Sequence, residues 1–175
     1  GTFTYTPGAG EQGTVTFDYT IADGDGDTST ATATITLTPD STPTVSVTDG
    51  TVDEKGLPTG TGELADNIAG NDTSETTTGT FTITTGGDTL QKLEITDKTN
   101  TKIDVTAATS GSPIVVQGVN GDLTVTSDGA GHYSWSYTLA HNLLTHDVAG
   151  AGDTKPGEAL LVTVTYSDGS SSTDT

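Results

Sequence analysis

The chain has 175 residues, and its 24 acidic side chains against 5 lysines and no arginine give a formal net charge of −19. This length allows one or two small domains and excludes a large multidomain enzyme. The charge repels phosphate backbones and anionic headgroups, which disfavours nucleic-acid and membrane-surface binding. The chain has no cysteine, which excludes disulfides and thiolate metal sites. No apolar run reaches the ~20 residues that cross a bilayer, so we expect a soluble segment of a longer protein.

The supply of core-forming residues is small. Leu, Ile, Val and Phe together make up 33 residues, or about 19% of the chain, a level that with high net charge is typical of disorder. Their strict alternation with polar residues indicates folded strands instead. A thin core carrying so much negative charge is marginal by itself. We therefore expect metal cations to complete the fold.

Alternating segments follow one another along the chain, separated by Gly, Asp and Ser turns. One face of each segment is apolar and the other is mostly Thr or Ser, which predicts half-buried antiparallel strands. The 41 threonines suit the outer face of such strands. No long window has helical periodicity, so we predict an all-β sandwich. The alternating positions begin with Phe3/Tyr5, Val15–Ile21, Ala31–Leu37, Val45/Val47 and Phe81/Ile83, and continue with Leu93/Ile95, Ile103/Val105, Leu123/Val125, Tyr133–Leu139 and Leu160–Tyr166.

A polar stretch with two prolines, Thr38–Pro43, divides the chain into two parts. Such a composition is typical of a stiff linker. We predict three strands before it, and eight or so strands, enough for a complete sandwich, after it. The predicted domains are therefore residues 1–40 and residues 41–175.

A weak internal repeat relates the two parts. Gly1–Tyr5 with Thr14–Thr30 resembles Gly131–Tyr137 with Leu160–Thr173, and in each copy an aromatic strand precedes an alternating strand and an Asp-Gly turn. The second copy stops at Thr175, before its expected last strand. Two interpretations stay open: the first part is the end of a separate module, or it donates the strand that the second part lacks.

Several short segments of the chain resemble those of a known protein family. Residues 1–38 resemble the C-terminal half of a cadherin-like repeat from giant bacterial surface proteins. Residues 44–175 resemble the Ig-like repeat of type I-secreted RTX adhesins, in the words Val52-Asp-Glu-Lys-Gly-Leu-Pro, Thr77-Thr-Gly-Thr-Phe, Tyr133-Ser-Trp-Ser-Tyr-Thr-Leu and Val162-Thr-Val-Thr-Tyr-Ser-Asp-Gly. The resemblance implies an antiparallel Ig-like or cadherin-like β-sandwich that binds Ca²⁺ at domain junctions. It also implies a spacer at the cell surface of a Gram-negative bacterium.

The sharpest candidate site is the turn Asp23-Gly24-Asp25-Gly26-Asp27. Three carboxylates at alternate positions can converge on one hard cation where glycines let the backbone curl, which suits Ca²⁺ with its 6–8 oxygen ligands. The spacing departs from the EF-hand loop, because Thr28 and Thr34 occupy its glycine and glutamate positions. The alternative interpretation is an ordinary acidic hairpin turn.

A second candidate lies at the predicted junction between the two parts. Strand parity places Asp168 toward the linker that holds Asp40. Asp49, Asp53 and Glu54 follow the linker in sequence, so we predict that these carboxylates share Ca²⁺ there and fix the angle between modules. The alternative is that Asp53 and Glu54 form a solvated acidic bend.

The remaining polar clusters carry weaker signals. The acidic stretch Glu63–Glu75 is predicted to be an exposed loop rather than an ion site. Asp97-Lys98 and Asp128-Gly129 are predicted to be hairpin turns. The histidines at positions 132, 141 and 146 lack the spacing and companion ligands of a zinc site, and we expect surface or loop-packing roles. Trp135, the single tryptophan, is predicted to lie in the sandwich core. One helical turn is expected within Leu139–Val148.

No catalytic motif is present in the sequence, and a glycosidase cleft is disfavoured by the 5% aromatic content. We therefore predict a Ca²⁺-stabilised, non-enzymatic and monomeric spacer of a secreted adhesin, in contact with neighbouring repeats of its own chain. It would hold a ligand-binding tip away from the cell for adhesion or biofilm formation. The alternative is a Ca²⁺-dependent glycan- or peptide-binding module, which an exposed aromatic beside an acidic loop would favour.

Overall fold

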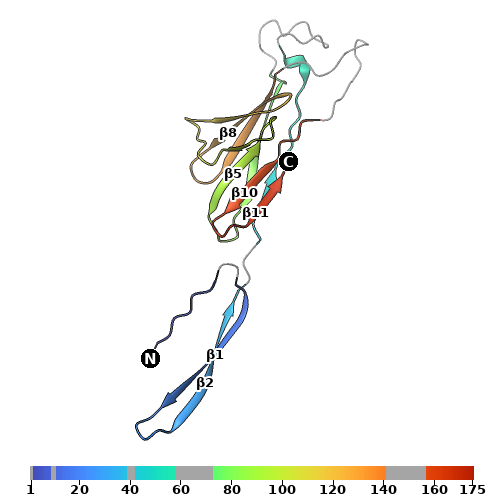
Figure 1. The fold of residues 1–175 in the computed structure, drawn as a ribbon. Coiled ribbons are helices and arrows are strands. Elements are labelled where there is room, and N and C mark those ends of the chain that lie inside the picture. Colours follow the sequence, from blue (N-terminus) through green and yellow to red (C-terminus); the bar gives the residue numbers. More distant parts are fainter. Residues whose placement is uncertain (1, 9–10, 39–41, 58–72, 141–156) are drawn as a thin grey trace. The chain divides into compact units, whose positions relative to one another are not determined.

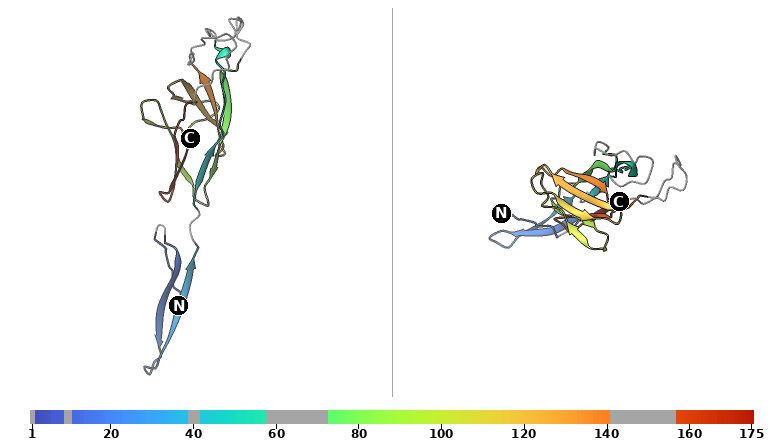
Figure 2. Two further views of the ribbon diagram at one scale, coloured as in Figure 1. Left: turned by 90° about the vertical axis from the view of Figure 1, so that its right-hand side faces the viewer. Right: turned by 90° about the horizontal axis from the view of Figure 1, so that it is seen from above.

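The computed structural model describes residues 2–8, 11–38, 42–57, 73–140 and 157–175 (Figure 1). The chain divides into two compact units, Gly1–Thr42 and Pro43–Thr175. Further views of each unit are given in Figure 2. Among the described residues, no helix has the length and apolar character that crossing a membrane requires.

The first unit is built on one antiparallel hairpin, β1 (Gly13–Ala22) with β2 (Thr28–Leu37). The period-two pattern puts the large apolar side chains of both strands on one face, because opposite residues pair Val15 with Ile35 and Phe17 with Ala33. The other face is a polar ladder, in which Thr32 donates a hydrogen bond to the Asp18 carboxylate at 2.6 Å.

The prediction of a third strand in this unit is wrong. Residues 2–8 are described but have no strand pairing. Phe3 nevertheless contacts Phe17 of β1, with ring centroids 4.7 Å apart and planes at 86°. The Tyr5 hydroxyl donates a hydrogen bond to the Glu11 carboxylate. The segment therefore keeps its aromatic contact with the hairpin without forming a backbone ladder.

The second unit is a two-layer antiparallel sandwich. One sheet has the order β11-β10-β5-β6, and the other has the order β3-β4-β9-β8-β7. A short 3₁₀ turn, η1 (Glu54–Gly56), follows β3. The strands are β3 (Thr44–Val47), β4 (Thr76–Thr84), β5 (Leu90–Thr96), β6 (Lys102–Asp104), β7 (Ile114–Gln117), β8 (Gly121–Ser127), β9 (Tyr133–Leu139), β10 (Val162–Tyr166) and β11 (Ser171–Asp174).

The core lies between these two sheets and comes from the predicted alternating positions. In β10, Val162, Val164 and Tyr166 are at most 2% exposed. They pack with β5 residues of the same sheet and with β8 and β9 of the opposite one. Trp135 is 7% exposed and belongs to this cluster, which confirms its predicted place in the core.

A strand follows the Asp-Gly turn of the second unit, where the sequence comparison expected none before Thr175. Residues 171–174 form β11, which pairs with β10 along Thr163–Thr173 and Val164–Ser172. Side chains of β11 also satisfy the outer amides of β3: Val45 N donates to Ser172 Oγ at 3.2 Å, and Val47 N donates to Asp174 Oδ2 at 2.7 Å. The two sheets are thus joined along one side by side-chain hydrogen bonds.

Trp135 leaves no room for a side chain at Gly79 of β4, its cross-strand partner. A Cβ atom at position 79 would lie 2.2 Å from Thr48 Oγ1 and 2.4 Å from Trp135 Cζ2. We predict that Gly79→Ala lowers the free energy of unfolding by about 1–3 kcal/mol through overpacking. Gly111→Ala is the matched control, because a Cβ there meets nothing within 4 Å.

Urea unfolding followed by the fluorescence of Trp135 measures both variants. Equal midpoints for Gly79→Ala and Gly111→Ala would contradict this packing of the tryptophan against β4.

Candidate metal centre

The carboxylates of Asp23, Asp25 and Asp27 converge at the tip of the β1–β2 hairpin. The ladder ends at the pair Ala22–Thr28, so the five residues between them form the turn. One carboxylate oxygen from each aspartate lies within 4.8 Å of those of the other two, and all three residues are exposed. The predicted convergence of these three side chains is therefore present in the structure.

Asp23 organises this turn through its backbone and its side chain. Its amide donates to the Asp27 carbonyl at 3.0 Å, and its carbonyl accepts from Gly26 N at 3.3 Å. Its Oδ1 accepts from the amides of Gly26 at 3.1 Å and Asp27 at 2.8 Å. Gly26 has a φ of +100°, a conformation that glycine adopts without a steric penalty. The glycine at position 26 and the Asp23 side chain together explain the tight curl of the loop.

The electrostatics of the cluster favour a cation. The pKa of Asp23 lies below its ordinary value, first because the Asp25 side chain hydrogen-bonds to it and then because the Asp27 amide does. Carboxylates whose oxygens lie within 4.8 Å of one another repel when they are charged. A bound cation would relieve the same repulsion.

The donor set fits Ca²⁺ in its chemistry. Carboxylate oxygens are hard ligands, and three aspartates supply three to six of the 6–8 oxygens that Ca²⁺ takes. Solvent would complete the shell, because all three residues are exposed. The structure therefore supports a metal-binding candidate at this tip, with calcium as the proposed ion.

Asp168, predicted to share an ion with other carboxylates at the junction, lies in the β10–β11 turn. The hydroxyl of Tyr166, just before this turn, donates to the Thr44 carbonyl at 3.4 Å. Asp168 therefore lies at the end of the second unit where β3 begins. Its Oδ1 accepts hydrogen bonds from the amide and the hydroxyl of Ser170 at 2.8 and 2.7 Å. Asp40, its predicted partner, lies outside the described residues.

Asp53 and Glu54 lie at the opposite end of the second unit from Asp168. The Asp53 amide donates to the Ser74 carbonyl at 2.8 Å, just before β4 begins. Thr44 pairs with Thr84 at the other end of β4. The structure thus does not bring Asp53 and Glu54 together with Asp168, and their predicted role as calcium ligands stays a prediction.

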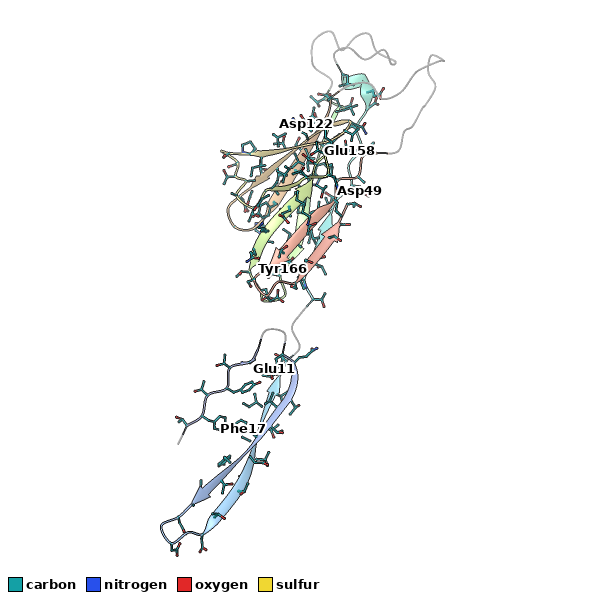
Figure 3. All side chains as sticks on the ribbon, in the orientation of Figure 1. Glu11, Phe17, Asp49, Asp122, Glu158 and Tyr166 are labelled. Carbon is teal, nitrogen blue, oxygen red and sulfur yellow. The ribbon has the colours of Figure 1, made fainter. Side chains whose placement is uncertain are left out.

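The other polar candidates are distributed over the second unit. Asp49 is exposed just after β3, where Figure 3 labels it. Glu75 is the last residue of the acidic stretch Glu63–Glu75, and its Oε2 is buried without a hydrogen-bond partner. His132 is exposed, and its Nδ1 lies 2.7 Å from Asp128 Oδ2. Residues 63–72, the histidines at positions 141 and 146, and the helical turn predicted within Leu139–Val148 lie outside the described residues, apart from Leu139 and Ala140.

Several other aspartates are used by their own turns. Asp97 Oδ1 accepts from the amides of Thr99 and Thr101, both at 2.8 Å. Asp128 Oδ1 accepts from Ala130 N at 2.8 Å. The pKa of both aspartates is lowered, for Asp97 chiefly by a hydrogen bond from the Thr99 hydroxyl and for Asp128 chiefly by the hydrogen bond with the His132 side chain. Both segments are turns, as predicted.

A carboxylate that the sequence did not single out holds the β7–β8 turn. Glu158, which precedes β10, accepts hydrogen bonds from the amides of Val119 and Asn120, the latter at 2.9 Å. Its Oε2 also accepts from the Tyr137 hydroxyl at 3.0 Å, and burial followed by this bond raises the pKa of Tyr137. Figure 3 labels Glu158 near Asp122 of β8. No local motif could identify this role, because the partners lie 38 and 39 residues apart.

Asp104 secures a core strand through a relay of hydrogen bonds. Its Oδ1 accepts from the Thr106 hydroxyl at 2.6 Å, and that hydroxyl accepts from the amide of buried Leu93 at 2.8 Å. The pKa of Asp104 is lowered from 3.8, chiefly by the Thr106 hydroxyl. A carboxylate whose pKa is lowered by folding gives its full stabilisation at pH values above its ordinary pKa. This stabilisation is lost as the pH falls through the lowered pKa.

We therefore predict that Asp104→Ala lowers the thermal midpoint at about pH 7, and that the difference from the unsubstituted chain closes as the pH falls below about 3. Thermal unfolding measured across this range tests it. A difference that stayed constant down to about pH 2 would show that the carboxylate charge is not the source of the stabilisation.

A shallow hollow lies on the outer face of the five-stranded sheet. Ser134 and Ser136 of β9 lie between the threonines of β4 and β8 that flank them. The residues that line it are Thr78, Gly79, Thr80, Thr124, Thr126, Ser134, Trp135 and Ser136. It contains no carboxylate and is therefore no metal site, and the buried indole of Trp135 gives it no exposed aromatic platform.

Comparison with known proteins gives one match. Residues 1–36 match the family model of a bacterial Ig domain. No curated protein and no solved structure matched the chain. With the antiparallel sheets described above, this match confirms the predicted all-β, Ig-like sandwich class. It supports a bacterial Ig-like repeat with a structural role, since such domains are generally non-enzymatic modules and are often extracellular.

Proposed function

We propose that this chain is a calcium-stabilised extender of a bacterial cell-surface adhesin of the type I-secreted RTX class. The observation that carries the proposal is the convergence of Asp23, Asp25 and Asp27 at the tip of a hairpin that matches a bacterial Ig domain. The role is mechanical: a series of such modules holds a ligand-binding tip away from the cell for adhesion or biofilm formation.

Two features of the chain support a spacer. Each unit is built from antiparallel strands, and the two units follow each other in sequence. The tip that bears the three aspartates lies at the end of its hairpin opposite Leu37, the residue that leads into the linker. The tip is therefore available to a neighbouring module on its far side, and we propose neighbouring repeats as the partners of this chain.

Calcium would act by removing repulsion. Three carboxylates within 4.8 Å oppose the folded turn when all are charged. An ion that binds only the folded turn stabilises it by mass action. Extracellular modules bind Ca²⁺ with dissociation constants of about 0.1–1 mM, so the millimolar calcium outside a cell would fill such a site and the low cytosolic level would leave it empty before export.

We predict that calorimetric titration of the chain with CaCl₂ shows a site with a dissociation constant of about 0.1–1 mM. Asp25→Asn removes one charged ligand without touching the amide contacts that Asp23 makes, and it weakens this site about tenfold because ligand charge sets calcium affinity. Asp18→Asn is the matched control. Asp18 is an exposed carboxylate on the same hairpin, and its bond to Thr32 lies on the polar face of the ladder.

Equal affinities for Asp25→Asn and Asp18→Asn would place any binding elsewhere in the chain. A titration with no heat beyond dilution would remove calcium from the proposal, and the hairpin tip would then be an acidic turn without a ligand.

A further inference from the structure

The first unit carries an apolar sheet face that its own described residues leave open. Tyr19 is 49% exposed and Ile21 is 63% exposed, although both continue the inward-facing positions of β1. Phe3, which contacts the same face, is 62% exposed. Within the described residues, β1 pairs with β2 and its other edge has no strand beside it. A two-stranded hairpin with one apolar face is marginally stable in water.

The internal repeat shows that the corresponding face is covered in the second unit. The motif Val-Thr-x-x-Tyr begins at Val15 in β1 and at Val162 in β10, so Tyr19 corresponds to Tyr166. Each strand then enters an Asp-Gly turn and pairs antiparallel with the next strand. In the second unit, Tyr166 is 0% exposed. The same position is therefore fully buried in one copy and half-exposed in the other.

The surroundings of β10 show which groups cover this face. The free edge of β10 pairs with β5, in the register Val162–Ile95 and Val164–Leu93. Its apolar side chains belong to the cluster that includes Trp135 of the opposite sheet. The contact of Phe3 with Phe17 has a counterpart there, because the repeat equates Phe3 with Tyr133 of β9, a member of the same cluster.

We propose that the apolar face and open edge of β1 form a docking surface for the body of an Ig-like sandwich that has no final hairpin of its own. The occupant supplies one edge strand, as β5 does, and one apolar inner sheet face, as β4, β8 and β9 do. The second unit of this chain cannot be that body in its described form, since β10 and β11 already hold the position. This proposal follows from the internal repeat and from the different exposure of Tyr19 and Tyr166, and it does not depend on calcium binding.

The test replaces β10 and β11 by a second copy of the first hairpin in the otherwise complete chain. In this chimera, residues 1–161 are followed by residues 15–38, so that Val15 takes the place of Val162. A second version carries Phe17→Val in the copy, because Val164 is the smaller residue at the matching core position. Urea unfolding followed by the fluorescence of Trp135 is the readout. We expect one cooperative transition with a buried tryptophan in at least one version.

Two controls define the other outcomes. The chain that ends at Leu161 is expected to lose the cooperative transition. The chimera with Tyr19→Ser in the copy is expected to lose it too, because the large apolar side chain that matches Tyr166 is removed. Loss of the transition in both versions that keep Tyr19, with Phe17 or with Phe17→Val, would overturn the proposal. Sedimentation of the original chain addresses a second copy as occupant: a dimer that Tyr19→Ser dissociates would also overturn it.

Discussion

The second unit depends on the burial of one strand, β10, against β5 on its edge and against the opposite sheet on its face. Val164 and Tyr166 have no exposed surface, and they contact the cluster to which Trp135 belongs. Burial of this kind contributes about 25 cal/mol per Å² of apolar surface. Few other large apolar residues in the described part of the chain could replace the contacts of this strand. The side-chain bonds from β11 to β3 then close the sandwich along one side.

In most of the turns that the structure describes, nearby amides and hydroxyls stabilise the negatively charged carboxylates through hydrogen bonds. Asp97, Asp104 and Asp128 each accept hydrogen bonds from nearby amides or hydroxyls, which favours their charged forms. Glu158 also accepts backbone amide hydrogen bonds, in its case from the β7–β8 turn, which is distant in sequence. The hairpin tip differs because three carboxylates meet there. Local hydrogen bonds satisfy Asp23 but leave the mutual repulsion of the cluster, and this makes the tip the best candidate for a cation.

The alternation of apolar and polar residues predicted most of the strands, because a half-buried strand needs one apolar face. It missed β7, where Ile114, Val115 and Val116 are consecutive, and β11, which has only Ser, Thr and Asp. The predicted junction site fails for a different reason. β3 lies between the linker and Asp53, so Asp53 and Glu54 follow the far end of this strand, whereas Asp168 lies where β3 begins. The Asp23 cluster was predictable because its three carboxylates lie within five residues.

A two-dimensional ¹H–¹⁵N NMR titration of the chain with CaCl₂ determines whether calcium binds the folded hairpin tip. We expect the amides of Asp23, Gly26 and Asp27 to shift together and to saturate at millimolar calcium, while the amides of the β10 core stay in place. Unchanged tip amides, or shifts confined to the second unit, would mean that calcium does not bind the tip.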